Sequence, residues 1–196
     1  MHEGVRAREY VMRRADRPGD LGWMVMAHGE LYHRQFGWNA EFEGLVAKIV
    51  AEYAARVGQD DSEAAWIAEV DGERAGCVML VADDRPAAAK LRTLLVTPAA
   101  RGLGMGTRLV AETLRFARAA GYRSVSLWTT DNLASARRIY QSFGFILAEE
   151  APHHGFGHDL VGQTWTLALD AVPEAEPARR GSVRATTPPA APPSWR

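Results

Sequence analysis

The stretch that decides the fold begins where an apolar run gives way to a glycine-rich turn. Over residues 94–107 it reads Leu94-Leu95-Val96-Thr97-Pro98-Ala99-Ala100-Arg101-Gly102-Leu103-Gly104-Met105-Gly106-Thr107. The apolar residues predict a buried strand that Pro98 closes. Glycines permit positive φ and a close approach of a ligand to the backbone. The free N–H groups of the helix that follows favour an anion such as a pyrophosphate.

Two common phosphate-binding patterns do not fit this loop. A P-loop has Gly-Lys-Ser/Thr where the helix begins, whereas this chain has Gly106-Thr107-Arg108. A dinucleotide fingerprint has Gly-x-Gly-x-x-Gly at the first strand-to-helix turn, whereas residues 102–106 are spaced Gly-x-Gly-x-Gly and follow a hairpin. A tight turn that binds no ligand remains open as an alternative.

The hydrophobic pattern on both sides of the loop predicts strands and helices in a definite order. Predicted strands cover 10–14, 65–70, 76–82, 89–96, 124–130, 145–149 and 163–169, and predicted helices cover 19–35, 39–57, 105–120 and 135–143. Asp71-Gly72 is a strong hairpin signal, and Asn39 is a helix cap. The order β-α-α-β-β-β-α-β-α-β-β predicts an α/β fold with a mixed, mostly antiparallel sheet flanked by helices.

Composition limits the class of protein. The chain has 196 residues, a formal net charge of −1 and one cysteine. These values exclude an internal disulfide and a strongly basic nucleic-acid-binding surface, and no apolar run is long enough for a membrane span. We expect a soluble cytoplasmic protein with one domain over 8–170. We expect residues 1–7 and the Pro/Ala-rich tail 171–196 to be disordered.

Two segments resemble the motifs of one enzyme family. Residues 101–106 are similar to the Arg/Gln-x-x-Gly-x-Gly/Ala signature of GNAT-family N-acetyltransferases. Residues 136–145 are similar to that family's Ala-x-x-x-Tyr-x-x-x-Gly-Phe segment. The two lie in the family's order, separated by one predicted helix and one strand. The resemblance covers about 8–170. Within the family, residues 28–32, 36–38 and 153–163 resemble acetyltransferase domains fused behind MarR-type regulators.

The resemblance implies acetyl-CoA as cosubstrate and direct transfer to an amine in a ternary complex. A strand N–H near Leu95 would stabilise the oxyanion. The family's cofactor-binding asparagine falls at Leu133 here, with Asn132 one residue earlier. The cofactor-binding positions carried over are Leu94, Leu95, Val96, Arg101, Gly102, Leu103, Gly104, Met105, Gly106, Thr107 and Asn132.

Tyr140 is the catalytic residue that the resemblance implies, as the proton donor or hydrogen-bond donor to the departing CoA thiolate. A core aromatic without a chemical role is the alternative. For the general base we name Glu69, with His28, His153, His154 and His158 as alternatives. Cys77 lies in an apolar run and is predicted to be a buried small hydrophobe.

The acceptor site is predicted between the first two helices and the last hairpin, with His28, Tyr32 and His154 as substrate-binding residues. Aromatic residues interleaved with histidine suit a small-molecule amine or an amino-acid-like acceptor. No metal, nucleic acid or membrane partner is expected, and a homodimer is a guess from base rates. The rival hypothesis is a non-catalytic acyl-CoA-binding or sensing module.

Overall fold

The computed structural model describes residues 10–59 and 61–169. Both terminal segments that the sequence predicts to be disordered lie outside these residues, apart from none of the domain's core. One sheet organises the fold, with its seven strands in the order β1-β2-β3-β4-β5-β7-β6. The elements are β1 (Tyr10–Arg14), α1 (Asp20–Phe36), α2 (Ala40–Arg56), β2 (Ala64–Val70), β3 (Glu73–Ala82), β4 (Ala88–Val96), a 3₁₀ turn (Pro98–Ala100), α3 (Met105–Ala119), β5 (Ser124–Thr130), α4 (Ala134–Ser142), β6 (Ile146–Gly155) and β7 (His158–Ala168).

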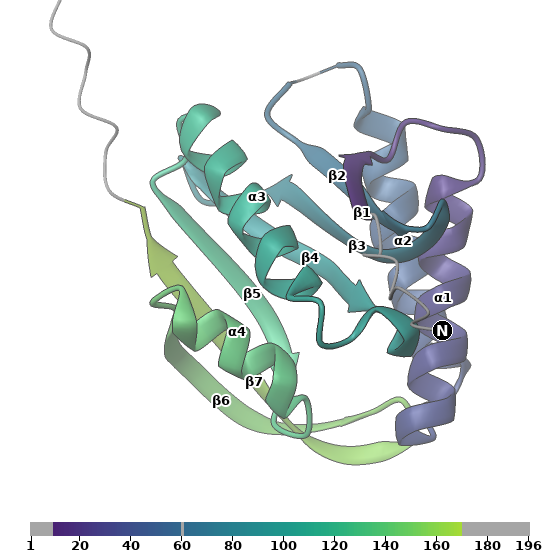
Figure 1. The fold of residues 1–196 in the computed structure, drawn as a ribbon. Helices are drawn as coiled ribbons and strands as arrows, with labels where there is room; N and C mark the ends of the chain where they lie inside the picture. The colour runs from purple at the N-terminus through teal and green to yellow at the C-terminus, as the bar shows by residue number, and fades with distance from the viewer. Residues whose placement is uncertain (1–9, 60, 170–196) are drawn as a thin grey trace, which may run out of the picture.

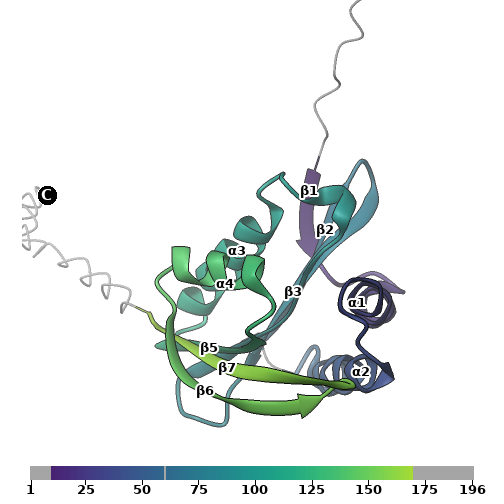
Figure 2. The same cartoon turned by 90° about the horizontal axis from the view of Figure 1, so that it is seen from below.

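Helices cover both faces of the sheet. Figure 2 shows α1 and α2 on one side of the sheet, with α3 and α4 on the other. Each layer has its own apolar core, one around Met79 and Ile67 under α1 and α2 and one around Leu109 and Val125 under α3. The predicted α/β class and the predicted order of strands and helices are therefore confirmed.

Local sequence signals explain where the elements begin and turn. The side chain of Asn39 accepts a hydrogen bond from the N–H of Glu41 at 3.0 Å and caps α2. Asp71 and Gly72 have φ values of 52° and 83°, which form the tight turn between β2 and β3. Both predictions are confirmed.

A buried ion-pair network fixes the start of α1. The carboxylate of Asp20 is fully buried and lies 2.6 Å from the guanidinium of Arg13 and 2.8 Å from that of Arg74. The hydrogen bond from Arg13 holds the pKa of Asp20 at about 2. Removing one partner would leave a buried charge uncompensated, so this network anchors α1 to β1 and β3.

The final hairpin is longer than the sequence predicts. Strands β6 and β7 run to Gly155 and from His158, whereas the sequence predicts strands only over 145–149 and 163–169. Most of β6 is exposed, so the alternating apolar pattern that marks a half-buried strand is missing there. No helix in the described part of the chain is long and apolar enough to cross a membrane.

Candidate functional site

The sheet opens between its two central strands. Strands β4 and β5 are parallel and pair only where Ala88–Lys90 meets Ser124–Ser126. Figure 1 shows the two strands separating beyond that point. From Leu91 onward, the edge of β4 that faces β5 pairs with no strand among the described residues. Two adjoining cavities lie along this open edge.

The larger one, which we call the loop cavity, has a volume of about 690 Å³. It is lined by Leu31, Tyr32, Gln35, Phe36, Leu94, Leu95, Val96, Ala100, Arg101, Gly102, Gly104, Met105, Gly106, Thr107, Asn132, Leu133, Ala134, Ser135, Ala136 and Ile139. The structure thus brings together every predicted cofactor-binding residue except Leu103, whose side chain is exposed outside this lining. Asn132 and Leu133 both take part.

Glycine is required at two positions of the loop. Gly102 and Gly104 have φ values of 79° and 70°, a region that strains residues with a Cβ. A Cβ built on either glycine meets no atom within 4 Å, so the space in front of this backbone is open. Gly104 is the N-cap of α3, where unpaired N–H groups and the helix dipole favour an anion. The guanidinium of Arg101 reaches across to Gln35 Oε1 at 2.8 Å.

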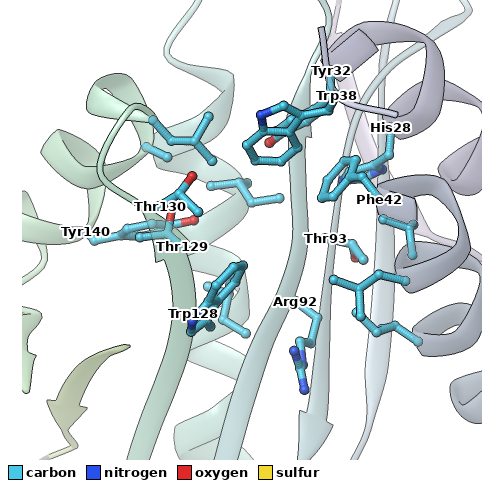
Figure 3. A pocket seen from close by; sticks show the side chains of 17 residues that line it. His28, Tyr32, Trp38, Phe42, Arg92, Thr93, Trp128, Thr129, Thr130 and Tyr140 are labelled. Atoms are coloured by element: carbon cyan, nitrogen blue, oxygen red, sulfur yellow. The ribbon is translucent and has the colours of Figure 1, made fainter. Parts of the chain in front are cut away.

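The smaller one, which we call the aromatic cavity, has a volume of about 90 Å³ (Figure 3). It is lined by His28, Tyr32, Trp38, Phe42, Leu45, Val46, Ile49, Leu91, Arg92, Thr93, Leu94, Trp128, Thr129, Thr130, Leu133, Ala136 and Tyr140. Four residues line both cavities, namely Tyr32, Leu94, Leu133 and Ala136. A ligand in the loop cavity can therefore present one end to a second ligand in the aromatic cavity.

Tyr140 lies in the wall of the aromatic cavity. Its side chain extends from α4 toward Thr129 and Thr130 (Figure 3) and is 5% exposed. Burial raises its pKa, and the nearby Tyr32 adds to the shift. The phenol is therefore protonated at neutral pH and can donate a hydrogen bond. This position agrees with the role that the motif implies, and it also packs the ring against Phe145.

His28 faces the same cavity from α1. Its side chain is almost fully buried, and its Nδ1 lies 2.7 Å from the carbonyl oxygen of Met24. Its Nε2 is buried without a hydrogen-bond partner among the described residues. Burial lowers the pKa of His28 to about 4, so the ring is neutral at neutral pH. Tyr32 stacks on it at 5.8 Å between ring centroids.

Glu69 lies apart from both cavities. Its carboxylate accepts a hydrogen bond from Arg13 at 2.8 Å and lies 3.5 Å from the guanidinium of Arg17. Arg13 in turn binds Asp20 at the first turn of α1. Eight residues separate Asp20 from His28, which is about 12 Å along a helix. The structure thus joins Glu69 to the ion-pair network that anchors α1, and does not place it with Tyr140.

The histidines of the last hairpin do not gather at one point. His154 is exposed and pairs with Asp159 across the hairpin at 2.6 Å. Its pKa is raised by that hydrogen bond, and it lines neither cavity. His158 Nε2 lies 3.2 Å from the carbonyl oxygen of Gly37, while the His153 ring packs on Trp128 and Phe156. Of the three predicted substrate-binding residues, only His28 and Tyr32 line the aromatic cavity.

Cys77 is fully buried, as predicted, and burial raises the pKa of its thiol. Its Sγ lies 3.4 Å from the carbonyl oxygen of Thr93. A thiol that is protonated and enclosed is a poor nucleophile.

Sequence reasoning missed most of the wall that β4 and β5 contribute. Arg92, Thr93, Trp128, Thr129 and Thr130 all line the aromatic cavity. Trp128 interrupts an apolar strand with an exposed large side chain, but no sequence signal marks Thr93 as a bulge residue. The bulge becomes visible only in the pairing of β4 with β3, where the register shifts between Cys77 and Met79.

Comparison with known proteins agrees with this geometry. The model of the acetyltransferase (GNAT) family matches residues 26–145, more than half of the chain. An uncharacterized N-acetyltransferase of Schizosaccharomyces pombe is 31% identical over 137 residues, which cover 70% of this chain and 83% of that protein. The chain belongs to the GNAT acetyltransferase family and is an N-acetyltransferase by that membership.

Other relatives are similar over less of their length. A mycothiol acetyltransferase of Sanguibacter keddieii is 33% identical over 147 residues, which cover 70% of this chain and 44% of that protein. A putative acetyltransferase of Salmonella typhimurium, solved with its cofactor acetyl-CoA, shares the fold with a TM-score of 0.66. It is 24% identical, and the match covers 85% of this chain and 99% of that one. The likeness to MarR-fused domains stays a prediction.

Proposed function

We propose that the protein transfers an acetyl group from acetyl-CoA to a primary amine of a small molecule, directly and within a ternary complex. The observation that carries the proposal is the meeting of the loop cavity and the aromatic cavity at Leu94 and Leu133, beside Tyr140. This arrangement supplies a cosubstrate site, an acceptor site and a hydrogen-bond donor at their junction.

The loop cavity fits the cosubstrate on three grounds. The open backbone at Gly102 and Gly104, together with the start of α3, suits the pyrophosphate. The unpaired edge of β4 beyond Lys90 suits the pantetheine amides, which can bind as an added strand. The thioester then lies near Leu95, where a backbone N–H stabilises the oxyanion.

In the proposed reaction the neutral amine attacks the thioester carbonyl carbon. The new C–N bond forms as the C–S bond breaks, the nitrogen gives up one proton to solvent, and the thiolate is protonated to free CoA. Tyr140 donates a hydrogen bond to the thiolate as charge develops on sulfur. Because burial raises the pKa of the phenol above that of an ordinary thiol, Tyr140 acts through this hydrogen bond rather than by complete proton transfer.

A screen of small amines for release of free CoA tests the proposal. We expect release that depends on both acetyl-CoA and an amine, with at least one acceptor saturating. Tight binding of acetyl-CoA by calorimetry, without release from any amine, would instead support a non-catalytic acyl-CoA-binding module.

A further inference from the structure

We propose that the acceptor is an α-amino acid, whose carboxylate binds Arg92 and whose amino group donates to His28 Nε2 and Thr93 Oγ1. This inference rests on the proposed function and adds the chemical class of the acceptor. The three groups line one side of the aromatic cavity, where Figure 3 shows them on β4 and α1.

Arg92 supplies the positive charge. Its guanidinium has no carboxylate or other hydrogen-bond partner among residues 10–59 and 61–169, unlike the guanidinium groups of Arg13, Arg56 and Arg74. An arginine that lines a cavity walled by aromatic rings attracts an anion more strongly than one in open water. Its planar donor pair matches a carboxylate in a bidentate geometry.

A bulge in β4 turns Arg92 and Thr93 toward the same cavity. In a regular strand, successive side chains point to opposite faces. Here Cys77 pairs with Leu95 but Met79 pairs with Arg92, so β4 contains one extra residue opposite Val78. Thr93 has a φ of 53°, which is unusual for a β-branched residue. As a result, the consecutive residues 91–94 all line the aromatic cavity.

His28 and Thr93 supply the hydrogen-bond acceptors. Because the carbonyl oxygen of Met24 only accepts, Nδ1 of the neutral imidazole carries the hydrogen and Nε2 keeps its lone pair. Both Nε2 and the Oγ1 of Thr93 are buried, and neither has a partner in the described part of the chain. Buried polar atoms are normally paired, so a ligand with N–H donors is the natural complement. A simple amine would satisfy these two atoms but would leave Arg92 without an anion.

Aromatic rings around these groups favour an apolar amino acid. Tyr32, Trp38 and Phe42 pack within 5.0 Å of one another between ring centroids, and Trp128 forms a further wall. An apolar side chain gains by covering such rings, whereas a second charge would lose its hydration there.

Matched acceptors test the carboxylate. CoA release is measured with phenylalanine, leucine and methionine, each compared with its α-carboxamide and with the corresponding decarboxylated amine. We expect kcat/KM to be higher for the amino acid by about 30-fold or more, as for loss of a charged hydrogen-bonded pair. Equal or better activity with the amides and amines would overturn this inference and leave the proposed function intact. No release with any of the three classes, while acetyl-CoA still binds, would overturn both.

Two variants separate the roles of the side chains. Arg92→Met should raise KM for the amino acids by a similar factor and leave the values for the amides unchanged, and Arg92→Lys should recover part of the loss. His28→Leu should raise KM for amino acids and amides alike. Arg85→Met is the matched control, since Arg85 is 60% exposed on the β3–β4 loop and lines neither cavity. Melting temperatures report whether each variant folds. An Arg92→Met protein that folds and keeps its preference for carboxylates would overturn the assignment.

Discussion

The imidazole of His28 is tied by Nδ1 to the carbonyl oxygen of Met24, one helical turn earlier, at 2.7 Å. This single contact fixes which ring nitrogen carries the hydrogen and aims the other into the aromatic cavity. It also makes the charge state of His28 part of the stability of α1, because protonation would place a positive charge in a buried position.

The first prediction is a loss of stability in mild acid. The pKa of His28 is about 4 in the folded protein and 6.5 ordinarily, so the unfolded chain takes up this proton first as the pH falls. The contribution is fully present above pH 6.5 and declines as the pH falls toward 4. Between pH 7.5 and pH 5, we expect the free energy of unfolding to fall by about 2 kcal/mol from this residue.

Urea unfolding at the two pH values measures this effect, with His28→Phe as the control that keeps a ring but cannot titrate. The other histidines are common to both proteins, and the pKa of Asp20 is too low to contribute in this window. An identical pH dependence in the two proteins would contradict the account of His28.

The second prediction concerns the loop cavity. Gly104→Val forces a branched side chain into a φ of 70° and fills open space in front of the N-terminus of α3. We expect the acetyl-CoA dissociation constant to rise at least tenfold, equivalent to about 1.4 kcal/mol. Gly121→Val introduces the same kind of strain at a φ of 84°, far from either lining, and should cost stability without changing affinity. Unchanged calorimetric affinity in folded Gly104→Val would argue against a phosphate at this backbone.

The third prediction concerns Tyr140. Tyr140→Phe keeps the packing of the ring and removes only the hydroxyl, whose hydrogen bond to the thiolate grows in the transition state. We expect kcat to fall by roughly 10- to 1,000-fold, with acetyl-CoA affinity within a few-fold of the parent protein. Tyr53→Phe, at a buried tyrosine bonded to the backbone of Ala65, should affect stability alone. Equal kcat in Tyr140→Phe would make Tyr140 a packing residue.

The fourth prediction separates the ion-pair network from the chemistry. Arg13→Met leaves the buried carboxylate of Asp20 with less compensation and should lower the free energy of unfolding by about 3 kcal/mol or more. Glu69→Gln should lower stability less, because Asp20 keeps its partners, and kcat per folded molecule should stay within a few-fold. A large fall in kcat for a folded Glu69→Gln protein would restore Glu69 as the general base.

The sequence predicts the loop well because its signals are local. Glycine at 102 and 104 reports positive φ, and the apolar stripe of α3 reports the face that packs on the sheet. Strand β6 escapes prediction because its side chains are almost all exposed, and its turn places Phe156 at a φ of 59°. The ring of Phe156 is held by Trp38 and Phe42, more than a hundred residues away in the chain.

The site residues divide in the same way. Tyr140 belongs to a local motif and can be found from sequence, whereas the partner of Glu69 is Arg13, 56 residues earlier. Titratable residues of β2 and β7 look alike in sequence, and only tertiary contacts distinguish an ion-pair partner from a cavity wall. Arg92 is likewise one arginine among many until the bulge at Thr93 turns it toward the cavity.

The central claim is direct transfer of an acetyl group between two ligands that meet beside Tyr140. Its most direct test mixes the protein with acetyl-CoA labelled in the acetyl group, first alone and then with a saturating amine acceptor, and follows the label by mass spectrometry after rapid quenching. The account predicts that the label stays on CoA without the amine, moves to the amine nitrogen when it is added, and never appears on the protein. Label on the protein, or no transfer to any amine despite bound acetyl-CoA, would contradict it.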